Sequence, residues 1–348
     1  MMEGNSMAGS GLIVSNEQVQ SLSFLDFLRG GIHDWTVSLF DSETGGFRQS
    51  AQIGVNIMTS TDVAWMRYAA SDPDIGAPDR ERFIGYLARA QDPATGMVRH
   101  DRGPAGQGHC DGHAFWQTAR ALGILGGQLK RFPVHLAQVL TPSGLDAWFR
   151  GFDWTASGNG NHHEVLGLVP VLAGMNNPEW TDVFYQNIGS QQDDASGCWP
   201  QGGAINISRT FAYTALHMAG GRLPRRPEKI LCAMLTMQTE NGIWDNGMPG
   251  FHTMDAIFLL ARLPGLINSR EKEARDALRL TADRIRDIFA AFQPQLMDNP
   301  HKMLAMTHGL GLLQETFPEK FPSSIPFRFD WDRMEFYKHR VIQEAAAS

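Results

Sequence analysis

The sequence of 348 residues lacks the long apolar run of a membrane span, and no basic segment followed by a signal-type apolar stretch opens it. Its three cysteines are an odd number without CxxC spacing, which argues against a disulfide framework. With a net charge of −7, neither nucleic acid nor an anionic membrane is an expected partner. For the chain as it stands we expect a cytoplasmic protein, or a secreted or periplasmic one if a signal peptide has been removed. The oligomeric state is left open.

Strand-like alternation is also scarce, whereas apolar residues recur at intervals of three and four, which predicts helices. The helical segments are interrupted by a short phrase in which a small polar residue and a glycine precede an apolar or aromatic residue. An interval of roughly 40 to 60 residues between such phrases fits one helical hairpin with its loops. The glycines of the five phrases are Gly45, Gly96, Gly158, Gly197 and Gly242.

The two helices that flank each phrase differ in character. The preceding segment is amphipathic, which predicts an outer helix, and the following one is apolar almost all round, which predicts a buried inner helix. Residues 271–292 and 303–317 form a sixth pair. A glycine turns the chain between the two helices because it reaches positive φ at little cost. We therefore predict an all-α, (α/α)6-like toroid over residues 20–317, with tails at residues 1–19 and 318–348 and the second tail packed on the toroid.

In this pattern the chain resembles the α/α-toroid superfamily, which includes prenyltransferase and terpene-cyclase repeats, glycoside hydrolases and polysaccharide lyases. The resemblance implies that the loops after the outer helices and the first turns of the inner helices form one mouth. Each polar residue at these starts also fits a structural role as a helix cap or a hydrogen-bonded core residue. These residues are Asn56, Asp62, His109, Asp111, His113, Asn161, His162, His163, Glu164, Asn206, Arg209, Tyr213, His252, Asp255, His301, Lys302 and His308.

The sharpest local pattern is Asn161-His162-His163, followed later by Arg209 and, one helical turn beyond, by Tyr213. It is similar to the site of uronate-type lyases, including alginate and glucuronan lyases, in which an Asn-His pair faces an Arg and a Tyr. In the alginate lyases the tyrosine lies farther past the arginine than it does here. The resemblance implies β-elimination at a uronic-acid linkage without metal or cofactor. Asn, His or Arg donors would neutralise the substrate carboxylate, a histidine would be the base, and Tyr213 would be the acid or serve as both.

A second group of residues is expected to bind the anionic carbohydrate. The basic residues near position 100 would supply local positive charge, and the tryptophans would stack on sugar rings, although such aromatics are more often core. The pattern His109-x-Asp111-x-His113 also contains metal-ligand residue types, but its spacing matches no established motif, and we predict no metal. The expected binding residues are Arg99, His100, His109, His113, Trp199, Trp244, His252 and Asp255.

Three alternatives remain on the same fold. A glycoside hydrolase would use two carboxylates across the sugar. A terpene cyclase is disfavoured because neither DxDD nor DDxxD occurs. A non-catalytic sugar-binding toroid would need only the aromatics. The carboxylates available to a hydrolase are Asp111, Glu164, Asp194, Asp245 and Asp255.

Overall fold

The computed structural model describes residues 23–50, 52–98, 111–154, 160–172, 177–329 and 331. This part of the chain contains thirteen α-helices, a 3-10 helix and no β-strand, so the expectation of an all-α chain is confirmed. The elements are α1 (Phe24–Ser38), α2 (Ile57–Ala69), α3 (Arg80–Arg89), α4 (Asp111–Leu125), η2 (Val134–Leu140), α5 (Pro142–Arg150), α6 (Gly160–Gly167), α7 (Val169–Leu172), α8 (Pro178–Ser190), α9 (Ile207–Ala219), α10 (Pro227–Met237), α11 (Phe251–Ile267), α12 (Glu271–Met297) and α13 (Pro300–Thr316).

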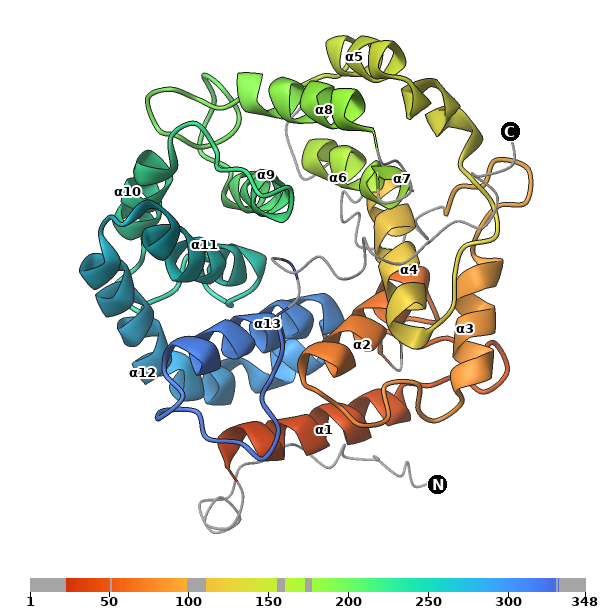
Figure 1. The fold of residues 1–348 in the computed structure, drawn as a ribbon. Coiled ribbons are helices and arrows are strands. Elements are labelled where there is room, and N and C mark those ends of the chain that lie inside the picture. Colours follow the sequence, from red (N-terminus) through yellow and green to blue (C-terminus); the bar gives the residue numbers. More distant parts are fainter. Residues whose placement is uncertain are drawn as a thin grey trace, which may run out of the picture.

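The helices fall into a central and a peripheral group (Figure 1). The central helices are α2, α4, α6, α9, α11 and α13. Each of them contacts the next in this order, and α13 in turn contacts α2. The peripheral helices α1, α3, α5, α8, α10 and α12 lie farther out in the same view. Central and peripheral helices alternate along the chain, as the hairpin pattern predicts.

Burial separates the two groups as the apolar pattern predicts. Helices α9, α11 and α13 are buried over most of their length. The peripheral helix α3 buries only Phe83 and Leu87, which lie one turn apart on one stripe. Among the described residues, no helix is long and apolar enough to cross a membrane.

The turn between a peripheral helix and the following central helix has a common construction. In the first of these turns the Thr44 N–H and hydroxyl donate to Asp41 Oδ1 over 2.9 and 3.0 Å. Gly45 then takes a φ of +83°, and a Cβ at this position would lie 2.6 Å from the Arg82 carbonyl oxygen of α3. Glycine is therefore required both for the left-handed conformation and for the close approach of the next hairpin.

Three more of the five turn glycines have the same conformation. Gly96, Gly197 and Gly242 have φ values of +72°, +73° and +79°, which confirms the prediction of positive φ. Gly158 lies outside the described residues. Asp193, which precedes Gly197, accepts from the Ser196 N–H and hydroxyl as Asp41 does from Thr44, and these bonds lower its pKa to about 2. The phrase that recurs in the sequence thus corresponds to the same hydrogen bonds in both of these turns.

After α13 the chain turns back and crosses the C-terminal ends of the central helices. The N–H of Arg328 donates to the Ala69 carbonyl at the end of α2 over 2.7 Å. The N–H of Phe327 donates to Gln314 Oε1 near the end of α13 over 2.8 Å. We call residues 318–329 together with Trp331 the C-terminal segment, and it packs on α2 and α13.

Candidate functional site

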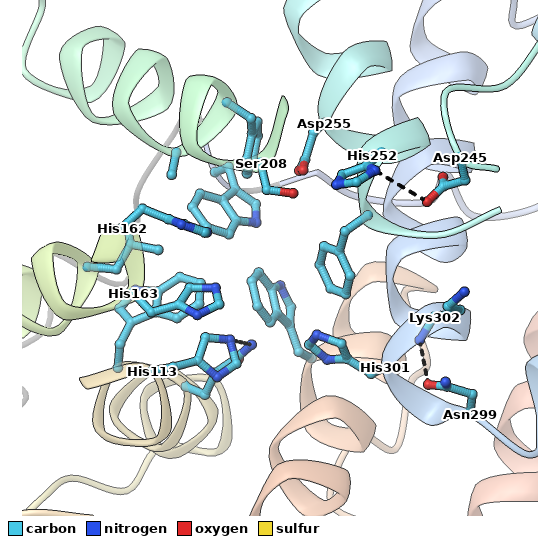
Figure 2. Close-up of a pocket in the computed structure, with 18 residues that line it drawn as sticks. His113, His162, His163, Ser208, Asp245, His252, Asp255, Asn299, His301 and Lys302 are labelled. Atoms are coloured by element: carbon cyan, nitrogen blue, oxygen red, sulfur yellow. Dashed lines mark hydrogen bonds and ion pairs between the residues drawn. The ribbon is translucent and has the colours of Figure 1, made fainter. Parts of the chain in front are cut away.

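A cavity of about 280 Å³ lies among the central helices, near their N-terminal ends. Helices α4, α6, α9, α11 and α13 each contribute a side chain from their first turns (Figure 2). Because a helix N-terminus carries partial positive charge, five such termini favour a negative or polarised ligand group. The residues that line the cavity are Trp65, His113, Trp116, Gln117, His162, His163, Leu166, Ser208, Phe211, Ala212, Asp245, Phe251, His252, Asp255, Asn299, His301, Lys302 and Trp331.

One part of the lining is aromatic. Trp331 lies against Trp65, Trp116 and Phe211, with ring centroids 5.5, 4.9 and 4.6 Å apart. Trp65 and Trp116 also meet edge to face at 5.4 Å. All three tryptophans are almost completely buried, so their positions are fixed by packing. These rings give the cavity a rigid apolar surface of the kind that sugar rings and other flat ligands contact.

A second part of the lining consists of imidazoles. The His163 ring lies 4.1 Å from the rings of both His113 and His162, measured between centroids. In Figure 2 these three side chains lie on one side of the cavity, opposite His252 and Asp255. Burial lowers the pKa of His162 to about 3, and the charges of Arg209 and His252 lower it further in the same direction. His162 is therefore neutral at neutral pH.

His301 lies beside His113, with ring centroids 5.9 Å apart, and contacts a buried carboxylate. Its Nδ1 is 3.0 and 3.1 Å from the two carboxylate oxygens of Asp62 on α2. Its ring is also 4.3 Å from that of Phe251. The carboxylate and the aromatic ring together fix the orientation of the imidazole.

Two carboxylates reach the cavity and differ in their surroundings. Asp245 Oδ2 accepts from the N–H groups of Gly250 and Thr253, both over 2.9 Å, and so caps α11 in place of the side chain that Gly250 lacks. Asp245 Oδ1 is 3.9 Å from His252 Nδ1. Asp255, by contrast, is 1% exposed, and neither of its oxygens has a partner with ordinary hydrogen-bond geometry.

The environment of Asp255 favours the protonated carboxylic acid. Burial raises its pKa well above the usual value, and the charge of Asp245 raises it further. The nearby Ser208 hydroxyl opposes this shift, which places it close to the carboxyl group although its geometry is not that of an ordinary hydrogen bond. Figure 2 shows this hydroxyl turned toward Asp255.

Several lining residues carry a buried polar atom without a hydrogen-bond partner among the described residues. These atoms are Gln117 Oε1, His162 Nδ1, both Asp255 oxygens and Trp331 Nε1. An unsatisfied buried polar group costs about 1–3 kcal/mol. Donors and acceptors are both present, so a ligand with several hydroxyl groups would satisfy them. The polar atoms therefore indicate a binding site rather than packed core.

The structure brings eight of the sequence-predicted residues into this cavity and leaves others outside its lining. The expected catalytic and binding residues that line it are His113, His162, His163, His252 and Asp255, and the further candidates are Asp245, His301 and Lys302. Arg209 and Tyr213 do not line it, although they share a face of α9 as predicted.

The reason lies in the packing around α9. Arg209 Nη1 donates to the Trp154 carbonyl over 3.0 Å. Tyr213 is fully buried between the rings of Trp154 and Trp199, at 6.3 and 5.6 Å. Burial raises the pKa of the Tyr213 phenol well above its usual range. The face of α9 that carries this pair thus points into the packing between hairpins.

The two tryptophans expected to bind sugar are also core residues here. The indole N–H of Trp199 donates to the Ile188 carbonyl of α8 over 2.9 Å, and that of Trp244 donates to the Met234 carbonyl of α10 over 2.7 Å. Neither lines the cavity. Each tryptophan instead closes the end of the peripheral helix that precedes it.

Other expected residues lie outside the described residues or act as caps. Arg99, His100 and His109 are not described, and neither are the side chains of Asn161 and Asp111. The remaining candidates Asn56 and Asn206 cap α2 and α9 by accepting from Thr59 N–H and Arg209 N–H. Within the described ranges, no three His, Cys, Asp or Glu side chains are grouped so that they could hold a metal ion.

The sequence interpretation did not assign Gln117, Ser208, Asn299 or Trp331 to a site, although all four line the cavity. Ser208 and Asn299 stand at the starts of predicted inner helices, which is the signal that could have identified them. Trp331 lies in the predicted tail, where no periodic pattern marks it. No protein-family model matches the chain, and no curated protein or solved structure is significantly similar to it.

Proposed function

We propose that the chain is an α/α-toroid enzyme that hydrolyses a glycosidic bond in a small carbohydrate, with Asp255 as the proton donor. The observation that carries this proposal is the buried carboxyl group of Asp255, whose oxygens have no hydrogen-bond partner of ordinary geometry among the described residues, in a cavity shared with Asp245. Burial raises the pKa of this carboxyl group and so favours its protonated form. The closed cycle of contacts among α2, α4, α6, α9, α11 and α13 supports the toroid. The cavity volume, just below the usual ligand-pocket range of about 300–1,000 Å³, suits a ligand of sugar-ring size.

The two carboxylates have complementary roles in this mechanism. Asp255 gives its proton to the glycosidic oxygen as the bond to the anomeric carbon breaks. A water molecule attacks that carbon, and Asp245 Oδ1 accepts the proton from the water. The cap hydrogen bonds from Gly250 and Thr253 occupy only Oδ2, which leaves Oδ1 toward His252 and the cavity.

The rest of the lining binds and orients the sugar. The rings of Trp65, Trp116 and Trp331 provide a surface for the apolar face of a pyranose. His162 and Gln117 offer buried polar atoms to its hydroxyl groups. Where a bound sugar displaces water from these groups, each of these hydrogen bonds gains strength.

A uronate lyase is the second candidate, and the contact among three imidazoles favours it. His113, His162 and His163 lie together in the cavity, and His162 is held neutral, as a base must be. Lys302 lines the same cavity and would neutralise a uronate carboxylate. This version needs an acid other than Tyr213, which lies outside the lining.

One assay separates the two candidates. The protein is incubated with neutral and uronic-acid oligosaccharides, while reducing ends and the ultraviolet absorbance of an unsaturated uronate are both recorded. Hydrolysis predicts new reducing ends without that absorbance, and β-elimination predicts both signals. Loss of activity in Asp255→Asn with retention in Tyr213→Phe would support the assigned proton donor. If calorimetry detects saccharide binding and no bond is cleaved, the protein is a sugar-binding toroid and the hydrolase proposal fails.

A further inference from the structure

The C-terminal segment enters the group of central helices from the end opposite the cavity mouth. Its backbone is tied to the C-terminal ends of α2 and α13 by the hydrogen bonds from Arg328 and Phe327. The Ser71 hydroxyl, just after α2, adds a bond of 2.6 Å to the Pro326 carbonyl. The site residues on the other helices come instead from N-terminal turns. The segment and the mouth thus lie at opposite ends of the same helices.

Two aromatic residues of the segment reach five of the six central helices. Trp331 contacts Trp65 of α2, Trp116 of α4 and Phe211 of α9. Phe329 contacts Phe258 of α11 and His308 of α13, with centroids 5.3 and 5.6 Å apart. A residue that touches helices distributed around a closed cycle lies near the middle of that cycle. The segment therefore blocks the central passage.

A glycine in α13 allows the segment to run so close to the helices. A Cβ at Gly311 would lie 2.9 Å from the Arg328 carbonyl oxygen, which is closer than real Cβ contacts. The backbone of the segment therefore lies directly against α13. A substitution of Gly311 would displace the segment, and Trp331 with it, although no residue that lines the cavity would itself be replaced.

Trp331 also has the features of a ligand contact. It is 3% exposed, it lines the cavity, and its indole N–H has no hydrogen-bond partner among the described residues. Trp199 and Trp244, by comparison, both donate to backbone carbonyls. An indole N–H that is buried at the edge of a polar cavity and left without an acceptor is available to a ligand oxygen.

We propose that the C-terminal segment is the closed floor of the site, and that Trp331 makes the enzyme act on the terminal unit of a saccharide chain. Because the described part of the segment covers the far end, a chain would enter from the N-terminal ends of the central helices, so its end would rest on Trp331 and the bond to the next unit would lie beside the two carboxylates. This inference rests on the proposed hydrolase function for its reaction. The floor itself is a claim about structure and is tested separately.

The floor is tested with indole as a probe in thermal unfolding experiments. Trp331→Ala should lower the melting temperature by several degrees, and millimolar indole should restore part of the loss by filling the vacated space. Trp148→Ala is the matched control, because Trp148 lies on the peripheral helix α5, packs against Phe152 just after it, and lies outside the cavity lining, so this variant should gain nothing from indole. Equal effects of indole on the melting temperatures of the two variants would refute the proposal that Trp331 forms the floor of the site.

The terminal-unit specificity is tested by product analysis on end-labelled oligosaccharides of increasing length. The wild type should release one unit at a time from one end. Trp331→Ala and Gly311→Ala should produce internal cleavage products, and Trp331→Phe should keep terminal cleavage with a KM raised about two- to tenfold by the lost hydrogen bond.

The outcomes distinguish the two proposals. Internal cleavage by the wild type would overturn the terminal-unit inference and leave the hydrolase proposal standing. Absence of any cleavage would overturn the hydrolase proposal and the terminal-unit inference together. The indole experiment would still decide whether Trp331 forms the floor.

Discussion

Asp245 and Asp255 line the same cavity, but of the two only Asp245 accepts hydrogen bonds from backbone N–H groups. The donors are the N–H groups of Gly250 and Thr253. Both donors bond to Oδ2 of Asp245, which lies at the N-terminus of α11. Burial instead favours the neutral form of Asp255. Two carboxyl groups at the start of α11, one in the preceding loop and one in the helix, thus have different surroundings, which is what the proposed acid and base roles require.

Replacement of Asp255 by Asn should abolish most of the activity without unfolding the protein. A general acid typically contributes about 10²- to 10⁴-fold in rate, and the amide has the same shape but no acidic proton. The measurement is kcat on the substrate that the oligosaccharide panel identifies. Asp245→Asn is the comparison, because it should lose activity and also about 1 kcal/mol of stability from the weakened cap of α11. Unchanged kcat in Asp255→Asn would refute the role of the acid.

The same substitution should change how stability depends on pH. The pKa of Asp255 is raised in the folded state, so above about pH 3.8 the unfolded chain releases this proton while the folded chain retains it. Wild-type stability therefore falls, relative to that of Asp255→Asn, as the pH rises from about 4 toward the raised pKa. Urea unfolding of both proteins between pH 4 and pH 8 measures the difference. A difference that stays constant over this range would show that Asp255 ionises normally.

His162 should affect stability with the opposite sign. Its pKa is about 3 in the folded state against 6.5 in the unfolded chain, so acid favours the unfolded chain. The contribution of neutral His162 is complete above about pH 6.5 and is lost as the pH falls toward 3. Between pH 7 and pH 5 the wild type should lose about 2 kcal/mol more than His162→Gln. An NMR titration in which the His162 ring protonates near pH 6.5 would contradict the assignment.

Tyr213→Phe discriminates between the two proposed reactions. The hydroxyl has no hydrogen-bond partner among the described residues and lies outside the cavity lining, so the variant should fold with unchanged or slightly higher stability. Its activity should stay far above the roughly 100-fold loss that removal of a general acid produces. A loss of that size, with normal thermal unfolding, would instead support the lyase mechanism with Tyr213 as its acid.

Trp199→Phe and Trp244→Phe should reduce stability and spare the site. Each substitution removes the indole donor from a carbonyl of the preceding helix, at a cost of about 0.5–1.5 kcal/mol. Urea unfolding measures the cost, and saccharide binding measured by calorimetry serves as the control. Weaker binding without loss of stability would mean that these rings contact the ligand, as the sequence interpretation expected.

The local parts of the fold were predictable because short-range physics determines them. Gly45, Gly96 and Gly197 need positive φ wherever the hairpins are placed, and the small polar residues before them accept or donate within the same turn. The contrast between amphipathic and all-round apolar helices follows from burial alone. These features require no knowledge of distant contacts.

The site was only partly predictable because its composition depends on helix rotation and on a distant segment. Arg209 and Tyr213 share a face, as their spacing requires, but the spacing does not specify whether that face points to the cavity or between hairpins. In a helix buried all round, no polar stripe marks the direction. Trp331 reaches the cavity through tertiary contacts far along the chain, which no local pattern encodes.

The contact between α2 and α13 has a consequence for how the protein unfolds. In an open repeat array a terminal repeat can fray alone, because it has only one neighbour. Here the first and last central helices are neighbours, and Ser324 N–H also donates to the Asp26 carboxylate near the start of α1. Among the described central helices, each has a neighbour on both sides, so we expect no terminal repeat from which unfolding can begin.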